Sequence, residues 1–85
     1  MQTVTIYTTS YCPYCNRAKH LLARKGVTFE EIDVTGDWAA RDALVEKADG
    51  RMTVPQIWIG DTHIGGSDEL YALDRDGRLD ALLAD

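Results

Sequence analysis

The chain has 85 residues, of which 45% are hydrophobic and 27% are charged, a composition typical of a compact globular domain and unlike that of a disordered segment. A formal net charge of -5 argues against a general nucleic-acid or anionic-membrane binder, because both need a basic surface. No stretch approaches the roughly 18 apolar residues of a membrane span, and residues 1–9 show no signal-peptide pattern. We therefore expect a single cytoplasmic domain over residues 1–85. We also expect it to be a monomer.

The first half of the chain alternates between extended and helical patterns. β-Branched and aromatic residues over 3–8 predict a central strand. Residues 13–25 change to helical spacing, with a proline in the first turn and Gly26 as the stop signal. Residues 27–34 return to an extended pattern, and a second helix is expected from about Trp38 to Ala48. This half therefore predicts the order βαβα.

The second half predicts a hairpin followed by a helix. Residues 56–59 and 62–64 flank Gly60-Asp61, a strong signal for a two-residue hairpin turn. A helical region follows Gly65-Gly66, with Ser67 expected as its N-cap, and a short terminal piece carries leucines at 79, 82 and 83. A right-handed βαβ crossover plus this hairpin gives a four-stranded mixed sheet with helices on both faces.

Two cysteines, Cys12 and Cys15, lie at the predicted junction between the first strand and the first helix. A disulfide between them would close almost no loop and would stabilise the fold little, so reactivity is favoured over stapling. A thiol at a helix N-terminus ionises more readily, which makes Cys12 the predicted nucleophile. Cys15 lies one turn further in, less exposed but able to attack a mixed disulfide formed at Cys12. Arg17 is the helix cation nearest to Cys12.

The alternative reading of the cysteine pair is half of a tetrahedral zinc site. The other half is missing, because the sequence has no second cysteine pair and its histidines are His20 and His63 alone. We read His63 as a strand residue rather than a ligand or base. The ligand count therefore favours redox chemistry, and no metal is expected.

Three motifs together resemble the glutaredoxin family. Cys12-Pro13-Tyr14-Cys15 looks like the active-site motif of dithiol glutaredoxins, which have the thioredoxin fold. Thr53-Val54-Pro55 resembles the family's threonine-valine-cis-proline element, and Gly65-Gly66-Ser67-Asp68 resembles its glycine-pair turn. The resemblance covers essentially the whole chain. It implies an α/β, thioredoxin-like βαβαββα fold and a glutathione-dependent oxidoreductase that reduces protein disulfides and protein-glutathione mixed disulfides.

The same resemblance implies where glutathione binds. Pro55 is expected to be cis and to lie against Cys12, which leaves the Val54 backbone free to pair with the cysteinyl unit of glutathione. Backbone N–H groups at the start of the last helix suit the γ-glutamyl carboxylate. Asp68 can accept from the α-ammonium group, or it can simply complement the helix dipole. The implied glutathione-binding residues are Tyr14, Thr53, Val54, Pro55, Gly66, Ser67 and Asp68.

The sequence departs from the family pattern near this site. Thr9 stands where many members have a lysine, which removes one cation that would favour the thiolate and a glutathione carboxylate. Arg41 and Arg51 are the candidates to replace that charge, although each is also explained as a surface arginine. Ser67 stands where several relatives carry a third cysteine. Trp58 replaces the usual phenylalanine and is read as a core residue.

Two rival functions follow from these details. A glutaredoxin-like redoxin would take electrons from thioredoxin reductase and serve one client, such as ribonucleotide reductase. Thr9 supports that alternative, whereas Tyr14 and the intact glycine-pair turn favour a glutathione binder. An iron-sulfur carrier would share a [2Fe-2S] cluster between the Cys12 thiolates of two chains, and Pro13 argues against it. The expected partners remain glutathione and disulfide-bearing or glutathionylated proteins.

Overall fold

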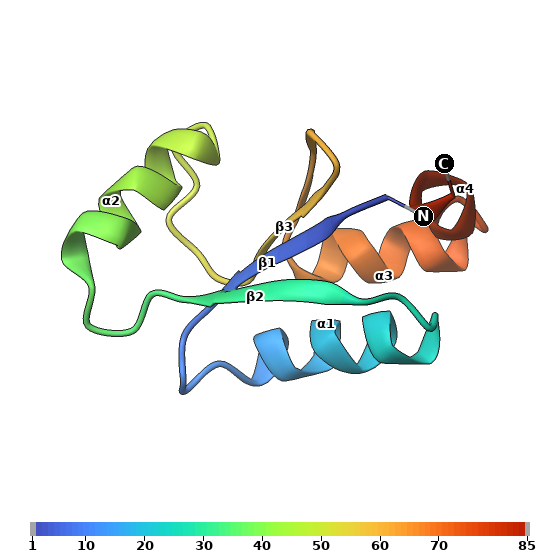
Figure 1. The fold of residues 1–85 in the computed structure, drawn as a ribbon, viewed down its shortest axis with the longest axis horizontal. Coiled ribbons are helices and arrows are strands. Elements are labelled where there is room, and N and C mark those ends of the chain that lie inside the picture. The colour runs from blue at the N-terminus through green and yellow to red at the C-terminus, as the bar shows by residue number, and fades with distance from the viewer. Residues whose placement is uncertain (1, 85) are drawn as a thin grey trace.

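The computed structural model describes residues 2–84, and within that range it contains a four-stranded sheet and four helices (Figure 1). In chain order the elements are β1 Val4–Thr8, α1 Pro13–Arg24, β2 Phe29–Asp33, α2 Trp38–Lys47, β3 Gln56–Ile59, β4 Thr62–Gly65, α3 Ser67–Arg75 and α4 Leu79–Leu83. The predicted strands and longer helices are therefore all present. The terminal leucines form the additional short helix α4, which extends the predicted order to βαβαββαα.

The sheet is mixed, with the strand order β2-β1-β3-β4. β1 pairs in parallel with β2, and antiparallel pairing joins β1 to β3 and β3 to β4. Val4 on β1 lies opposite Phe29 on one side and Ile59 on the other. This arrangement confirms the predicted crossover and hairpin, and it places β1 centrally, with its carboxyl end leading directly to the cysteines.

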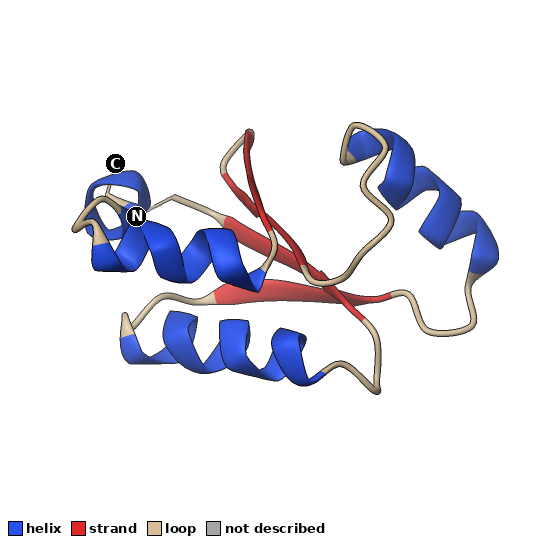
Figure 2. Ribbon diagram, turned by 180° about the vertical axis from the view of Figure 1, so that it is seen from behind, coloured by secondary structure: helices blue, strands red, loops and turns tan. Residues whose placement is uncertain are grey.

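The two faces of the sheet carry separate apolar clusters, because side chains alternate along each strand. On one face, Val4 and Ile6 pack with residues of α1, α3 and α4, including Leu22, Leu70 and Leu79. On the other face, a second cluster joins β3, α2 and the residue after β2, and it is composed of Val34, Leu44, Ala48 and Trp58. Figure 2 shows α1 and α3 side by side and α2 well apart from them. Helices therefore cover both faces, as predicted.

Local signals explain the ends of most elements. α1 ends at Arg24, and Gly26 follows with a φ of 73°, in the left-handed region that glycine tolerates best. α3 differs from the prediction, since its N-cap is Gly66 and Ser67 is its first helical residue. The carboxylate of Glu69 accepts from the Gly66 N–H at 2.7 Å and so supplies the capping contact.

The two tryptophans lie in opposite environments. Trp58 is 5% exposed and belongs to the core, as expected, whereas Trp38 at the start of α2 is 79% exposed. Trp38 is therefore not a core residue of this fold. None of the helices within residues 2–84 is long and apolar enough to cross a membrane.

Candidate active site

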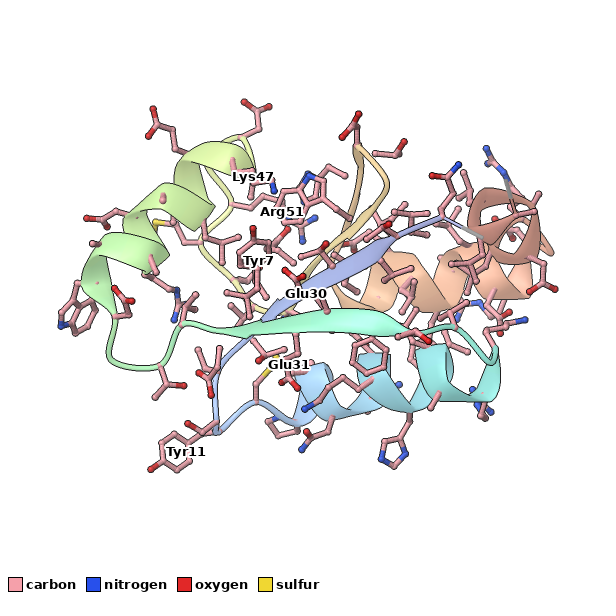
Figure 3. All side chains as sticks on the ribbon, in the orientation of Figure 1. Tyr7, Tyr11, Glu30, Glu31, Lys47 and Arg51 are labelled. Atoms are coloured by element: carbon pink, nitrogen blue, oxygen red, sulfur yellow. The ribbon has the colours of Figure 1, made fainter. Side chains whose placement is uncertain are left out.

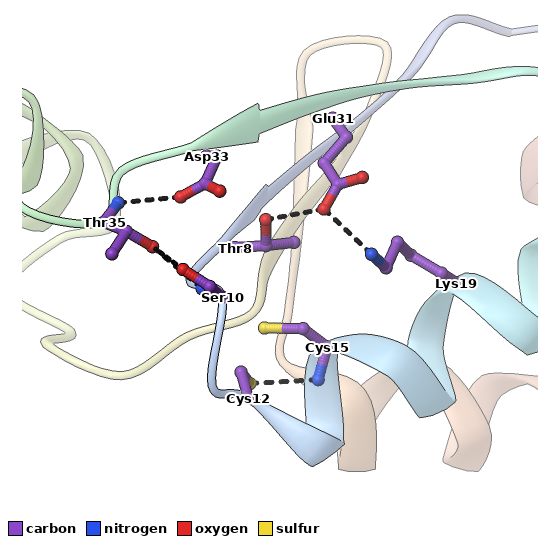
Figure 4. Close-up of polar contacts among 8 residues, drawn as sticks. All are labelled: Thr8, Ser10, Cys12, Cys15, Lys19, Glu31, Asp33 and Thr35. Atoms are coloured by element: carbon purple, nitrogen blue, oxygen red, sulfur yellow. Dashed lines mark hydrogen bonds and ion pairs between the residues drawn. The ribbon is translucent and has the colours of Figure 1, made fainter.

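Both cysteines lie where β1 leads into α1. Cys12 is the N-cap of α1 and has an extended backbone, so its sulfur can turn back toward the first turn of the helix. The Cys15 N–H donates to the Cys12 sulfur at 3.0 Å (Figure 4). The Cys12 thiol also lies 3.6 Å from the carbonyl oxygen of Val54. Cys12 is thus held by one backbone donor and one backbone acceptor, and the donor suits a thiolate.

Cys15 is the more enclosed of the two thiols. It is 1% exposed, against 9% for Cys12, as the sequence predicted. Burial, followed by the hydrogen bond with Cys12, raises the pKa of Cys15 to about 12. The Thr9 backbone and the charge of Lys19 act in the opposite direction without offsetting burial. Cys15 therefore keeps its proton at neutral pH.

A polar cluster that the sequence analysis missed lies beside Cys15. Glu31 on β2 accepts from the Thr8 hydroxyl at 2.8 Å and from the Lys19 ammonium at 2.9 Å (Figure 4). These contacts, the one from Lys19 first, lower the pKa of Glu31. Lys19 follows Cys15 by four residues and so shares its face of α1, which is the signal that could have identified it.

The loop before Cys12 is tied to the loop after β2. The Ser10 N–H donates to the Thr35 hydroxyl oxygen at 2.8 Å, and the two hydroxyls lie 2.9 Å apart. The Thr35 N–H in turn donates to Asp33 at 2.8 Å. Next to this tie, Tyr11 is 89% exposed and its ring points away from the fold (Figure 3). Two loops distant in sequence are therefore tied together next to Cys12.

A hollow of about 260 Å³ opens beside the cysteines. Its wall contains all seven residues that the resemblance implied for glutathione, together with Arg51 and Glu69: Tyr14, Arg51, Thr53, Val54, Pro55, Gly66, Ser67, Asp68 and Glu69. The Val54-Pro55 peptide is cis, as the resemblance implied. The hydroxyl of Ser67 is buried and has no hydrogen-bond partner within residues 2–84. That orphaned hydroxyl leaves a polar group available to a bound molecule.

The cations proposed from the sequence occupy different places. Arg51 lines the hollow, and its guanidinium pairs with Glu69 at 2.9 Å. Arg41 does not line it and donates to the Met52 carbonyl at 3.0 Å. The Arg17 guanidinium lies over the rings of Tyr14 and Tyr71, at 5.9 and 5.3 Å.

Of these three cations, Arg51 is the one that lines the hollow, and Thr9 itself lies outside it. For metal ions, no group of three or more histidine, cysteine, aspartate or glutamate residues comes together within residues 2–84.

Comparison with known proteins agrees with this geometry. Residues 4–64 match the glutaredoxin family model. A glutaredoxin of Pseudomonas aeruginosa is 61% identical over 84 residues, which span 99% of each chain. The solution structure of a glutaredoxin from Brucella melitensis has a TM-score of 0.86 and 54% identity, covering 98% of this chain and 89% of that one.

A matched structure of lower sequence identity is a complex with glutathione. The crystal structure of a buckwheat glutaredoxin-glutathione complex has a TM-score of 0.85 at 35% identity, and the match covers 94% of this chain and 74% of that one. Sequence, fold and cysteine motif lead to the same assignment. The chain belongs to the glutaredoxin family and is a glutathione-dependent dithiol oxidoreductase with a thioredoxin-like fold.

Proposed function

We propose that Cys12 is the nucleophile and Cys15 the resolving thiol of this oxidoreductase. The observation that carries the proposal is the asymmetry of the pair. The Cys12 sulfur accepts a backbone N–H at the helix start, while Cys15 is buried and keeps its proton. Only the thiolate form of a cysteine attacks a disulfide. The donor contact at Cys12 therefore selects it for the first attack.

The proposed cycle has two exchange steps. The Cys12 thiolate attacks the glutathione sulfur of a protein-glutathione disulfide, the S–S bond breaks, and the protein leaves as a thiolate that takes up a proton. A second glutathione thiolate then attacks the Cys12-glutathione disulfide, which releases oxidised glutathione and restores the Cys12 thiolate. With a protein disulfide, the thiol of Cys15 loses its proton and attacks the mixed disulfide, leaving a Cys12-Cys15 disulfide that two glutathiones reduce.

The hollow beside the cysteines is proposed to hold glutathione. Val54 offers its backbone, and the first N–H groups of α3 at Ser67 and Asp68 point where a carboxylate is favoured. The unpartnered hydroxyl of Ser67 adds a further polar contact. Tyr14 on α1 is half-exposed and flanks the opening. The buckwheat complex, which has the same fold and contains glutathione, supports this assignment.

Substrates and setting follow from the same chemistry. We propose that the clients are disulfide-bearing or glutathionylated proteins, with ribonucleotide reductase among the candidates. A reductase driven by glutathione needs a compartment where glutathione is kept reduced, which favours the cytoplasm. The protein is proposed to act as a monomer without a resident metal, and size-exclusion chromatography with metal analysis of the purified protein tests both points.

The proposed roles are tested with two serine variants and two substrates. Cys12→Ser is expected to abolish reduction of both a small glutathione mixed disulfide and a protein disulfide. Cys15→Ser should spare the first reaction and impair the second, because only the second needs a resolving thiol. Equal losses in both assays for Cys15→Ser would contradict the division of roles. Turnover supported by thioredoxin reductase and not by glutathione would contradict glutathione as the reductant.

A further inference from the structure

Gln56, the first residue of β3, is a fully buried polar side chain next to the cis-proline. Its amide nitrogen lies 2.9 Å from the Thr53 carbonyl oxygen and 3.3 Å from the Thr53 hydroxyl. Its amide oxygen lies 2.7 Å from Nε2 of His63 on β4. Both ends of the amide are therefore engaged, which a buried primary amide requires.

The hydrogen-bond directions in this set follow from chemistry. A backbone carbonyl only accepts, so the Gln56 –NH₂ must face Thr53 and its oxygen must face His63. The oxygen also only accepts, so Nε2 of His63 carries the proton and donates. The chain of contacts thus runs from His63 through Gln56 to Thr53, with one consistent orientation for each group.

His63 is itself fixed in place. Its ring stacks on Trp58 with centroids 4.5 Å apart and an interplanar angle of 19°. The ammonium of Lys47 lies 4.6 Å from the Trp58 ring centroid, and Tyr7 meets the same ring edge-on at 5.3 Å. Figure 3 shows Lys47 and Tyr7 extending toward the same region from α2 and β1. The His63 ring, which donates to Gln56, is therefore held in place by packing on Trp58.

One wall of the hollow is formed by Thr53, Val54 and Pro55. This segment directly precedes Gln56, the first residue of β3. Gln56 holds this wall at Thr53 from its buried side. We propose that Gln56, held by His63, is a positioning residue that sets the wall formed by Thr53, Val54 and Pro55 for glutathione. This inference rests on the proposed glutathione site. Gln56 is absent from the lining of the hollow and acts through Thr53.

The test compares steady-state kinetics on a small glutathione mixed disulfide. Gln56→Met keeps the length of the side chain and removes its two hydrogen bonds to Thr53 and its hydrogen bond from His63. We expect KM for the mixed disulfide to rise about tenfold, with kcat within about twofold of the parent, since releasing the wall at Thr53 costs about the net free energy of a well-formed buried hydrogen bond. Ile57→Val is the matched control. Ile57 is the next residue on β3, and it is buried in the apolar cluster on the other face of the sheet. It should lose stability and keep the parent KM.

The opposite results overturn the inference. A folded Gln56→Met protein with the parent KM, or an equal rise in KM for Ile57→Val, shows that the amide does not position the wall. Should Gln56→Met fail to fold, His63→Phe replaces it, since phenylalanine keeps a ring on Trp58 and removes the donor to Gln56. A smaller KM rise of about threefold is then expected, because Gln56 keeps its contacts with Thr53 and loses only the donor that holds it. The parent KM overturns the inference.

Asp68→Ala separates this inference from the proposed function. An unchanged KM in Asp68→Ala counts against the glutathione site itself, and with it against the inference. A raised KM in Asp68→Ala with an unchanged KM in Gln56→Met overturns the positioning role alone.

Discussion

The two adjacent glycines before α3 should respond very differently to alanine. Gly65 has a φ of 111°, where side chains are strained, and an added Cβ would lie 2.6 Å from Glu69 Oε1 and 2.7 Å from Arg51 Nη1. Gly66 has an ordinary φ of -99°, and its Cβ would lie 3.3 Å from the Pro55 carbonyl oxygen. Gly65→Ala should therefore reduce stability, and Gly66→Ala should mainly disturb the hollow.

The magnitude for Gly65→Ala combines two effects. A residue held in a sparsely populated backbone region costs about 1–3 kcal/mol. The added methyl also displaces the Glu69 carboxylate from the Gly66 N–H, and a hydrogen bond to a charged group contributes about 1.5–3 kcal/mol before discounting for solvent. Since the Glu69 side chain is 44% exposed, we expect a total loss of about 2–4 kcal/mol. That loss lowers Tm by on the order of 10–20 °C in a domain of this size.

Urea denaturation at pH 7 and mixed-disulfide kinetics measure both variants. Gly66→Ala should lose less than about 1 kcal/mol of unfolding free energy. It should also raise KM for the mixed disulfide, because its methyl presses on the wall at Pro55. A Gly65→Ala protein as stable as its parent would refute the argument from backbone strain, and a Gly66→Ala protein with the lower stability of the two would refute the comparison.

Four further outcomes follow from the structure. The pKa of Glu69 is lowered, chiefly by the Gly66 N–H. The stability that this carboxylate contributes is therefore present above about pH 4.5 and is lost as the pH falls. In urea denaturation at a series of pH values, Glu69→Gln should show a smaller loss of stability in acid than the parent. The pKa of Cys15 is raised from 9.0 to about 12, so stability should fall as the pH rises through this window, and Cys15→Ser should remove that fall. Thr35→Val breaks the two contacts that tie Ser10 to Thr35 next to Cys12, so alkylation of Cys12 by iodoacetamide should become slower. Ser10→Ala keeps the backbone N–H that donates to Thr35, and it should slow alkylation by a smaller factor. Leu22→Ala in the core should cost about 2–5 kcal/mol in urea denaturation.

Much of the fold could be predicted because its signals are local. Gly60-Asp61 lies between two strand patterns and forms the turn between β3 and β4. Gly26 ends α1 where the helical periodicity stops. α4 was predicted only as a short leucine-bearing piece, because five residues give too little periodicity to identify a helix.

The parts that the sequence did not reveal depend on contacts between distant residues. Glu31 reaches Lys19 and Thr8 only because β2 pairs with β1 and α1 covers the same face. From the sequence alone, a serine that follows a glycine pair is a reasonable N-cap. In the structure α3 begins one residue earlier than that prediction, and the carboxylate of Glu69 supplies the capping contact. Likewise, no local pattern separates Arg51 from Arg41. Their positions follow from how the segment after α2 folds back against the hollow.

Two segments of the hollow's wall, at Thr53 and at Gly66, are held by side chains that lie outside the three motifs. Gln56 holds the wall at Thr53 through a buried amide, and Glu69 holds the opposite wall through the Gly66 N–H and Arg51. Backbone groups recognise a ligand only if neighbouring side chains fix their positions. Changes at Gln56 and Glu69 should therefore alter glutathione affinity, although the motifs alone would identify neither residue.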